Sequence, residues 1–315
     1  MPEKIIIDTD PGIDDAMAIF FAMASPELEI LGLTTTFGNV SVDQATINAL
    51  NLVEMVGSSI PVARGVSVPM FQTPLPFPDF VHGVDGFGNV NLPAPKGKAI
   101  DLSAAEFIVK TVLENPNEIT LVAVGPLGNL ASALELEPRI ADLTKKVVIM
   151  GGTILETGNV SPVAEANIYN DPHAADIVFS ASWRVHMVGL DVTHKVTMND
   201  ELQARVRDSN PDFGQFLYDA GRFYADFYKA SRGADGCFVH DASAVAYAIN
   251  PDLFKVIDGP VRVATEGFAK GQTILKRAGY SYPENHWDVV TDSSVCMEVD
   301  EAALLSLYES TLMPQ

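Results

Sequence analysis

The N-terminal segment 4–15, K-I-I-I-D-T-D-P-G-I-D-D, constrains this chain more than any other stretch. Its three consecutive isoleucines form a short β-branched run, which is typical of a strand buried on both faces of a parallel sheet. Pro11-Gly12 then ends the strand, and an apolar stretch long enough for a helix follows. The segment therefore predicts a strand that leads directly into a helix, with four aspartates at the junction: Asp8, Asp10, Asp14 and Asp15.

These four aspartates indicate a cation site. In α/β proteins, ligands bind at the carboxyl ends of the strands. Carboxylates packed this closely repel one another unless a positive charge lies between them, and hard cations such as Ca²⁺ or Mg²⁺ prefer oxygen ligands. An aspartate at a helix start can instead cap the helix or interact with its dipole. We expect Asp8, which lies inside the strand end, to be the structural member of the four.

Strand and helix signals alternate along the rest of the chain and predict its fold class. Further strands are expected at residues 28–36, 60–63, 119–124, 147–150 and 185–191. Helices are expected after Ser41, near 103–113, from Asp171-Pro172 and near 300–310. This alternation is typical of an α/β protein with an open, mostly parallel, doubly wound sheet flanked by helices. Because no repeat or linker divides the chain, we expect a single domain over residues 1–315.

Two segments are predicted to be flaps over a site. Residues 65–98 contain six prolines together with His82 in a glycine-rich stretch. A loop of this length in a compact domain is usually functional or disordered, and its aromatic residues favour a lid. The second predicted flap spans residues 220–240 and overlaps an aromatic-rich segment, 209–232, whose rings at helical spacing are expected to be mostly packing residues. Asp241, directly after it, is expected to cap the next helix.

Composition limits the partners. The net charge is −21, from 41 acidic and 20 basic residues, so the chain would repel a phosphate-rich polymer and no nucleic acid partner is expected. The two cysteines, Cys237 and Cys296, exclude a disulfide framework and favour the reducing cytoplasm. No signal peptide precedes the first strand and no apolar run is long enough for a span, so no membrane partner is expected.

The opening segment resembles the N-terminal signature of the nucleoside hydrolases, which cleave the N-glycosidic bond of ribonucleosides. The resemblance continues in order through T-T-T-F-G-N-V, V-G-P-L-G-N-L, M-G-G-T, G-N-V-S-P-V-A-E-A-N and V-H-D-A, and G-Q-T at 271–273 extends it. It implies the Rossmann-like fold of that family. Gly128 and Lys276 depart from the pattern, standing where Thr and Asp are frequent. Both leave the implied catalytic residues intact, although Lys276 weakens any inference about C-terminal contacts.

The resemblance implies one Ca²⁺ ion per subunit, with ligands Asp10, Asp15, Asp241 and the main-chain carbonyl of Val124. Such a shell suits Ca²⁺, which takes six to eight oxygens when substrate hydroxyls and a water are included. Asp10 would also accept a proton from the attacking water as general base. The implied ribose site consists of five polar side chains and a methionine: Asp14, Asn39, Asn159, Glu165, Asn167 and Met150.

Two histidines, and two residues that precede His240 in the sequence, are expected to contact the substrate, mostly near the base that leaves the sugar. His240, beside Asp241, would be the general acid, and His82 would contact substrate. Tyr228 and Arg232 resemble the inosine-uridine preferring branch, where they would contact a purine or pyrimidine base, or else both are exposed helix residues. Family members are commonly homodimers or homotetramers. The remaining histidines are expected to be structural: His173, His186, His194 and His286.

Two other functions fit part of the sequence. Asp8-x-Asp10 at a strand end resembles the haloacid-dehalogenase phosphatases, with Asp8 as nucleophile beside Mg²⁺, but that family has no counterpart of the Asp14-Asp15 pair. A non-catalytic Ca²⁺-binding or ribose-binding protein would keep the sugar site without acid and base, whereas Asp10 and His240 supply both. We therefore expect a Ca²⁺-dependent nucleoside N-ribohydrolase acting on purine and pyrimidine ribonucleosides such as inosine and uridine.

Overall fold

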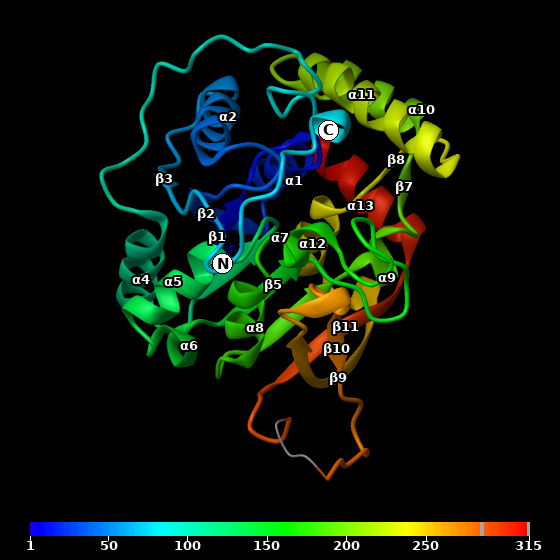
Figure 1. Cartoon of the computed structure of the whole chain (residues 1–315). Coiled ribbons are helices and arrows are strands. Elements are labelled where there is room, and N and C mark those ends of the chain that lie inside the picture. Colours follow the sequence, from blue (N-terminus) through cyan, green and yellow to red (C-terminus); the bar gives the residue numbers. More distant parts are fainter. Residues whose placement is uncertain (284–286, 314–315) are drawn as a thin grey trace.

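The computed structural model, which describes residues 1–283 and 287–313, is built around a mostly parallel sheet of nine strands (Figure 1). His286, expected to be structural, lies outside the described residues. The strands run in the order β10-β9-β11-β6-β5-β4-β1-β2-β3. Their bounds are β1 Glu3–Thr9, β2 Leu28–Thr35, β3 Val62–Arg64, β4 Ile119–Ala123, β5 Lys146–Met150, β6 Val185–Val188, β9 Phe254–Val263, β10 Thr273–Leu275 and β11 Asp292–Val299.

The sheet is doubly wound around β1, as the sequence predicts. From β1 the chain builds outward to β2 and β3 on one side and to β4, β5 and β6 on the other, and all of these neighbours are parallel. The order of strands reverses between β1 and β4, so their carboxyl ends frame the crevice in which open α/β sheets bind ligands. In the described sheet β9 runs antiparallel to both of its neighbours, β10 and β11, whereas β11 pairs with β6 in parallel.

Helices cover both faces of the sheet (Figure 1). Their bounds are α1 Ile13–Ala24, α2 Val42–Met55, α3 Asp79–His82, α4 Ala104–Glu114, α5 Gly128–Leu136, α6 Ile140–Leu143, α7 Ala166–Asn170, α8 Pro172–Ser180, α9 Leu190–Thr193, α10 Asp200–Ser209, α11 Gly214–Arg232, α12 Asp241–Ile249 and α13 Glu301–Leu312. Two single-turn 3₁₀ helices, Pro251–Leu253 and Gly267–Ala269, and a small sheet of β7 Thr197–Met198 with β8 Cys237–Phe238 complete the described elements.

The isoleucine run of β1 joins the two hydrophobic cores. Ile5 and Ile7 pack into the core that contains α1, α11, α12 and α13, whereas Ile6 packs into the core formed with α4, α5 and α8. All three side chains are buried, and each contributes roughly 1.5–3 kcal/mol of hydrophobic free energy. The predicted strand buried on both faces is therefore confirmed, and it fixes the position of the aspartates at its end.

Three sequence expectations need correction. The strand expected at 185–191 ends at Val188, because Gly189 turns the chain into the single helical turn α9. The strand expected at 60–63 is β3, Val62–Arg64. Asp241 does not cap α12 but is its first residue, after the N-cap His240, which makes no side-chain cap bond. Its carboxylate instead lies among other carboxylates, as described below.

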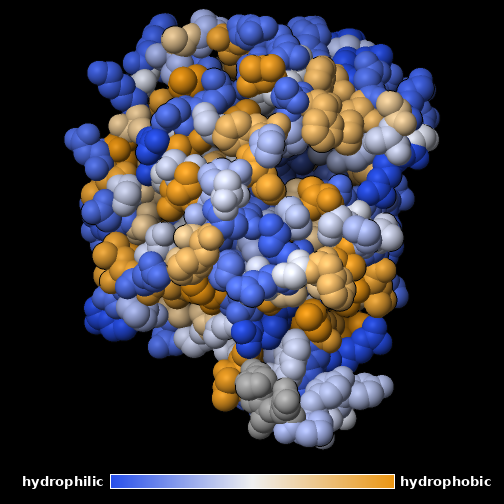
Figure 2. All heavy atoms as spheres, viewed as in Figure 1, coloured by the Kyte–Doolittle hydropathy of each residue, from blue (hydrophilic) through white to orange (hydrophobic). Residues whose placement is uncertain are grey.

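The segment 65–98 has a single regular helix in the described residues, the four-residue α3, which packs against α11. In Figure 1 the segment passes in front of the sheet and reaches α11 before it returns toward α4. Figure 2 shows hydrophilic and hydrophobic residues interspersed over the face in view. Among the described residues, no helix combines the length and the hydrophobicity that crossing a membrane requires.

Candidate active site

The aspartates at the β1–α1 junction have different partners. Asp8 accepts hydrogen bonds from the Thr34 hydroxyl and, at 2.7 Å, from Asn129 Nδ2. It is 1% exposed, and burial raises its pKa to about 7. These two donors, from β2 and α5, fit the structural role expected for Asp8.

Asp15 and Asp10 are held by backbone and side-chain donors. Asp15 accepts from Gly12 N at 2.9 Å and from Asn39 Nδ2 at 3.0 Å. Asp10 Oδ2 accepts from Asn39 N at 2.6 Å, while its Oδ1 is buried without a hydrogen-bond partner. A Cβ on Gly125 would lie 2.5 Å from Asp10 Oδ1, so a glycine is needed where the β4 loop passes this carboxylate.

Carboxylate oxygens of Asp14, Asp15 and Asp241 lie within 4.8 Å of one another. Burial raises the pKa of Asp14 and of Asp15 to about 6, and burial and the neighbouring carboxylates hold that of Asp241 well above its ordinary value. Asp14 Oδ1, like Asp10 Oδ1, has no partner. Buried, oxygen-only donors with unpartnered atoms fit a hard divalent cation. Two members of this group, Asp15 and Asp241, are expected metal ligands, whereas the third, Asp14, is expected at the ribose.

The expected carbonyl ligand and the ribose residues are linked by hydrogen bonds at the ends of β4 and β5. Asn167 Nδ2 donates to the Val124 carbonyl at 2.8 Å and to the Met150 carbonyl at 3.1 Å. A carbonyl oxygen has two lone pairs, so that of Val124 retains one for a cation. Glu165 caps α7 through Asn167 N at 2.8 Å and also accepts from Gly152 N at 2.9 Å. Burial raises the pKa of Glu165 to about 7.

A cavity of about 650 Å³ opens above this cluster, a size suited to a small organic ligand. Asp10 and Asp15 are buried behind it. The structure brings the other predicted site residues together as its lining: Asp14, Asn39, His82, Val124, Met150, Asn159, Glu165, Asn167, Tyr228, Arg232, His240 and Asp241.

The histidines of the cavity are buried and bonded. His240 Nε2 lies 2.8 Å from the Tyr228 hydroxyl, and its Nδ1 lies 2.8 Å from Thr193 Oγ1. His82 Nδ1 accepts from Ile13 N at 3.3 Å and lies 3.8 Å from Asp14 Oδ1. Burial lowers the pKa of His82 to about 4 and that of His240 well below its ordinary value. Both side chains can therefore offer a hydrogen bond without carrying a buried charge.

Sequence reasoning missed several residues of the site. Tyr224, expected to be a packing residue, lines the cavity and donates to Asp14 Oδ2 at 2.9 Å. Its spacing of four residues before Tyr228, on one helix face, was the available signal. Phe77, Phe80 and Phe227 also line the cavity, with the rings of Phe80 and Phe227 5.9 Å apart.

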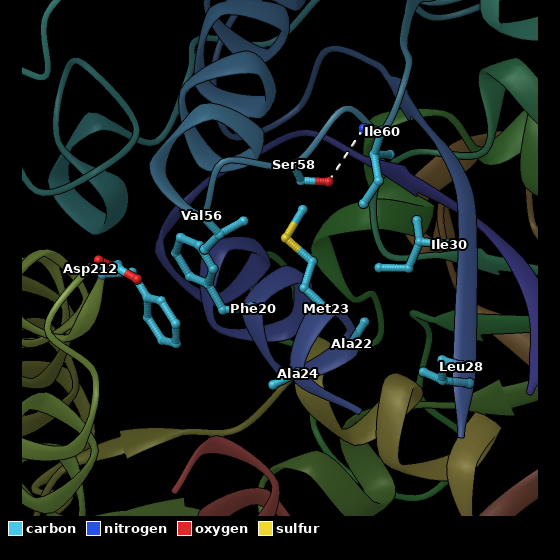
Figure 3. A pocket seen from close by; sticks show the side chains of 11 residues that line it. Phe20, Ala22, Met23, Ala24, Leu28, Ile30, Val56, Ser58, Ile60 and Asp212 are labelled. Atoms are coloured by element: carbon cyan, nitrogen blue, oxygen red, sulfur yellow. Dashed lines mark hydrogen bonds between the residues drawn. The ribbon is translucent and has the colours of Figure 1, made fainter. Parts of the chain in front are cut away.

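A second cavity, of about 400 Å³, lies at the opposite ends of the strands (Figure 3). It is lined by the end of α1, including Met23, and by the start of β2, including Ile30. Asp212 is the one charged residue in its lining. Apart from this carboxylate and the Ser58 hydroxyl the lining side chains are apolar, so the cavity has no cluster of groups for bond cleavage, and the site chemistry belongs to the larger cavity.

Comparisons with known proteins agree with this geometry. The family model described as inosine-uridine preferring nucleoside hydrolase matches residues 5–306. Uridine nucleosidase 1 of Arabidopsis thaliana is 43% identical over 316 residues, covering 99% of this chain and 93% of the relative. The inosine-uridine preferring nucleoside hydrolase of Leishmania major is 42% identical over 287 residues, covering 90% of each.

A solved structure of a plant nucleoside hydrolase, the PpNRh1 enzyme, superposes with a TM-score of 0.95 at 40% identity and covers 100% of both chains. The family match spans the ordered motifs, the carboxylate cluster and the cavity alike. The chain therefore belongs to the inosine-uridine preferring nucleoside hydrolase family, which makes it an enzyme that hydrolyses the N-glycosidic bond of ribonucleosides.

Proposed function

We propose that this nucleoside hydrolase requires one Ca²⁺ ion per subunit and accepts purine and pyrimidine ribonucleosides, inosine and uridine among them. The observation that carries the proposal is the buried carboxylate cluster with unpartnered oxygens beneath the 650 Å³ cavity. The names of two relatives, a uridine nucleosidase and an inosine-uridine preferring hydrolase, support the substrate range.

Asp10, Asp15, Asp241 and the Val124 carbonyl would hold the ion. When bound, Ca²⁺ would lower the pKa of a water and fix it near the sugar. Asp14, whose carboxylate lies beside those of Asp15 and Asp241, is close enough to contribute to the same site and to a ribose hydroxyl. Asn39, Asn159, Glu165 and Asn167 would complete the ribose site, with Met150 beside it.

Asp10 would serve as the general base. Its Oδ2 is held by Asn39 N, which leaves the unpartnered Oδ1 free to take a proton from the attacking water. As the bond to the base lengthens, positive charge develops on the sugar, and the surrounding carboxylates stabilise that charge. Attack opposite the departing base implies inversion at the anomeric carbon.

His240 would supply the proton for the departing base. Its Nε2, the adjacent Tyr228 hydroxyl and Arg232 face the same cavity, and the phenylalanines of the flap offer apolar surface for a planar base. His82, whose Nδ1 lies 3.8 Å from Asp14 Oδ1, would also contact the substrate. In this arrangement the sugar lies over the carboxylates and the base lies toward α3 and α11.

Three broader properties belong to the same proposal. Residues 65–98 and 220–240 act as flaps over the site of a single domain. The enzyme assembles as a homodimer or homotetramer, which light scattering on the purified protein would measure. It works in the cytoplasm, in keeping with its free cysteines, Cys237 and Cys296, both buried.

The role of Asp10 is tested by Asp10→Asn. We expect the variant to fold and to lose roughly 10²–10⁴-fold in turnover of inosine and uridine, because the amide cannot accept the water proton. Asp8→Asn is the matched control, since it makes the same change two residues away on a carboxylate to which the proposal gives no catalytic role and which accepts from Thr34 and Asn129. Wild-type turnover by Asp10→Asn would refute the assignment of the base.

A further inference from the structure

A chain of hydrogen bonds connects α9 with the carboxylate cluster. Thr193 Oγ1 lies 2.8 Å from His240 Nδ1, and His240 Nε2 lies 2.8 Å from the Tyr228 hydroxyl. The Tyr228 hydroxyl lies 3.3 Å from that of Tyr224, which lies 2.9 Å from Asp14 Oδ2. All five residues are buried. Thr193 is the one member that does not line the cavity.

The direction of every bond in this chain follows from its last member. The Tyr224 hydroxyl has a single proton and donates it to Asp14 Oδ2. Tyr224 can then only accept from Tyr228, and Tyr228 in turn can only accept from His240 Nε2. The proton of a neutral His240 imidazole therefore lies on Nε2. Its Nδ1 is left as an acceptor, and the partner that donates to it is the Thr193 hydroxyl.

Thr193 is well placed to hold this arrangement because its helical turn is fixed. Thr193 N donates to Gly189 O at 3.1 Å at the end of β6. On the same turn, the Asp191 carboxylate accepts from Ile154 N and Leu155 N, both at 2.7 Å, which ties α9 to the loop after β5. Thr193 itself is fully buried, so no solvent water takes the place of its hydroxyl as the partner of His240 Nδ1.

We propose that Thr193 is a positioning residue that holds His240 in the Nε2–H tautomer, with the proton on the nitrogen that faces Tyr228 and the cavity. The proposal rests on the function assigned above to His240, that of donor to the departing base. Without the Thr193 hydroxyl, only the bond to Tyr228 would favour this tautomer, and the alternative, with its proton on Nδ1, would present Nε2 to the cavity as an acceptor. Thr193 would act only through His240 and would not touch the substrate.

The kinetic test compares Thr193→Val, which removes the hydroxyl at nearly constant shape, with Thr193→Ser, which keeps it. For Thr193→Val we expect kcat on inosine and uridine to fall roughly 3- to 10-fold, the effect of one neutral hydrogen bond, with little change in KM. On p-nitrophenyl riboside, whose leaving group needs no proton, kcat should stay near wild type. Thr144→Val, which removes another buried hydroxyl bond, to Ile140 O, is the control.

The tautomer itself is read from the ¹⁵N shifts of the His240 ring, assigned by comparison with His240→Gln. We expect wild type and Thr193→Ser to have protonated Nε2 and unprotonated Nδ1, and Thr193→Val to lose that pattern. Unchanged ring shifts in Thr193→Val, or equal losses on nucleosides and p-nitrophenyl riboside, would overturn the proposal. If wild type hydrolyses no nucleoside, the proposed function fails instead, and the ring shifts still test the tautomer independently.

Discussion

At the scale of single residues, each carboxylate of the β1–α1 junction has its own set of partners. Asp8 accepts hydrogen bonds from Thr34 and Asn129 through Oδ1, Asp10 accepts from Asn39 N, and Asp14 accepts from the Tyr224 hydroxyl; each of the three keeps its other oxygen without a partner. Asp15 accepts several donors at once, including Gly12 N. Four aspartates that look equivalent in the sequence thus differ in their hydrogen-bond donors, and of the four only Asp14 lines the cavity.

The prediction at the scale of a single residue concerns His240. Removing its ring by His240→Ala should lower kcat on inosine and uridine by roughly 10²–10⁴-fold, because the departing base loses its proton donor. The loss should be much smaller on p-nitrophenyl riboside, because p-nitrophenolate is a good leaving group that needs no proton. Steady-state rates on the three substrates measure this difference. Small, equal losses on all three would show that His240 does not assist the leaving group.

At the scale of elements, the sequence correctly predicted those strands and helices that depend on signals within a few residues. The isoleucine run, Pro11-Gly12 and the following apolar stretch predicted β1 and α1 correctly, because strand burial and turn chemistry act over a few residues. The end of β6 was mispredicted, because the apolar run continues through Leu190 and Val192 into α9. Thr193, on that turn, gave no signal, since its partner His240 is distant in sequence.

The prediction at the scale of an element concerns the N-terminus of α1, where side chains pack closely against Gly12. A Cβ on Gly12 would lie 2.6 Å from His82 Nδ1 and 2.8 Å from Asn39 Nδ2. Gly12→Ala should therefore displace both side chains and lower kcat/KM on uridine by on the order of 10²-fold, a size typical of ångström-scale misplacement. Gly97→Ala, whose Cβ would meet the half-buried Glu54 side chain at 3.1 Å, is the control. Equal kcat/KM in both variants would contradict this account of α1.

At the scale of the whole molecule, the site is assembled from distant parts of the chain. Asp241 begins α12 and reaches Asp14 and Asp15 at the start of α1, because α1 and α12 pack together on one face of the sheet. Such proximity has no local signal, and only the resemblance of ordered motifs to a known family predicted it. The same resemblance did not identify Tyr224, whose hydroxyl joins Asp14 to the leaving-base side.

The whole fold also bears on the proposed cation. The sheet buries Asp14, Asp15 and Asp241 together, and burial raises the pKa of each. These carboxylates therefore hold protons more tightly than they would in water, and a divalent cation must displace those protons to bind. The proposed ion would neutralise the cluster and leave the neighbouring polar residues free to bind a neutral sugar.

The central claim is Ca²⁺-dependent cleavage of ribonucleosides at this cluster. The most direct measurement is the release of free base and ribose from inosine, uridine, guanosine and cytidine by protein as purified, after chelation, and after Ca²⁺ is restored. We predict that inosine and uridine yield base and ribose in equal amounts, that chelation abolishes release, and that Ca²⁺ recovers it. Undiminished release from protein with no measurable bound metal, or no release with Ca²⁺ present, would contradict the account.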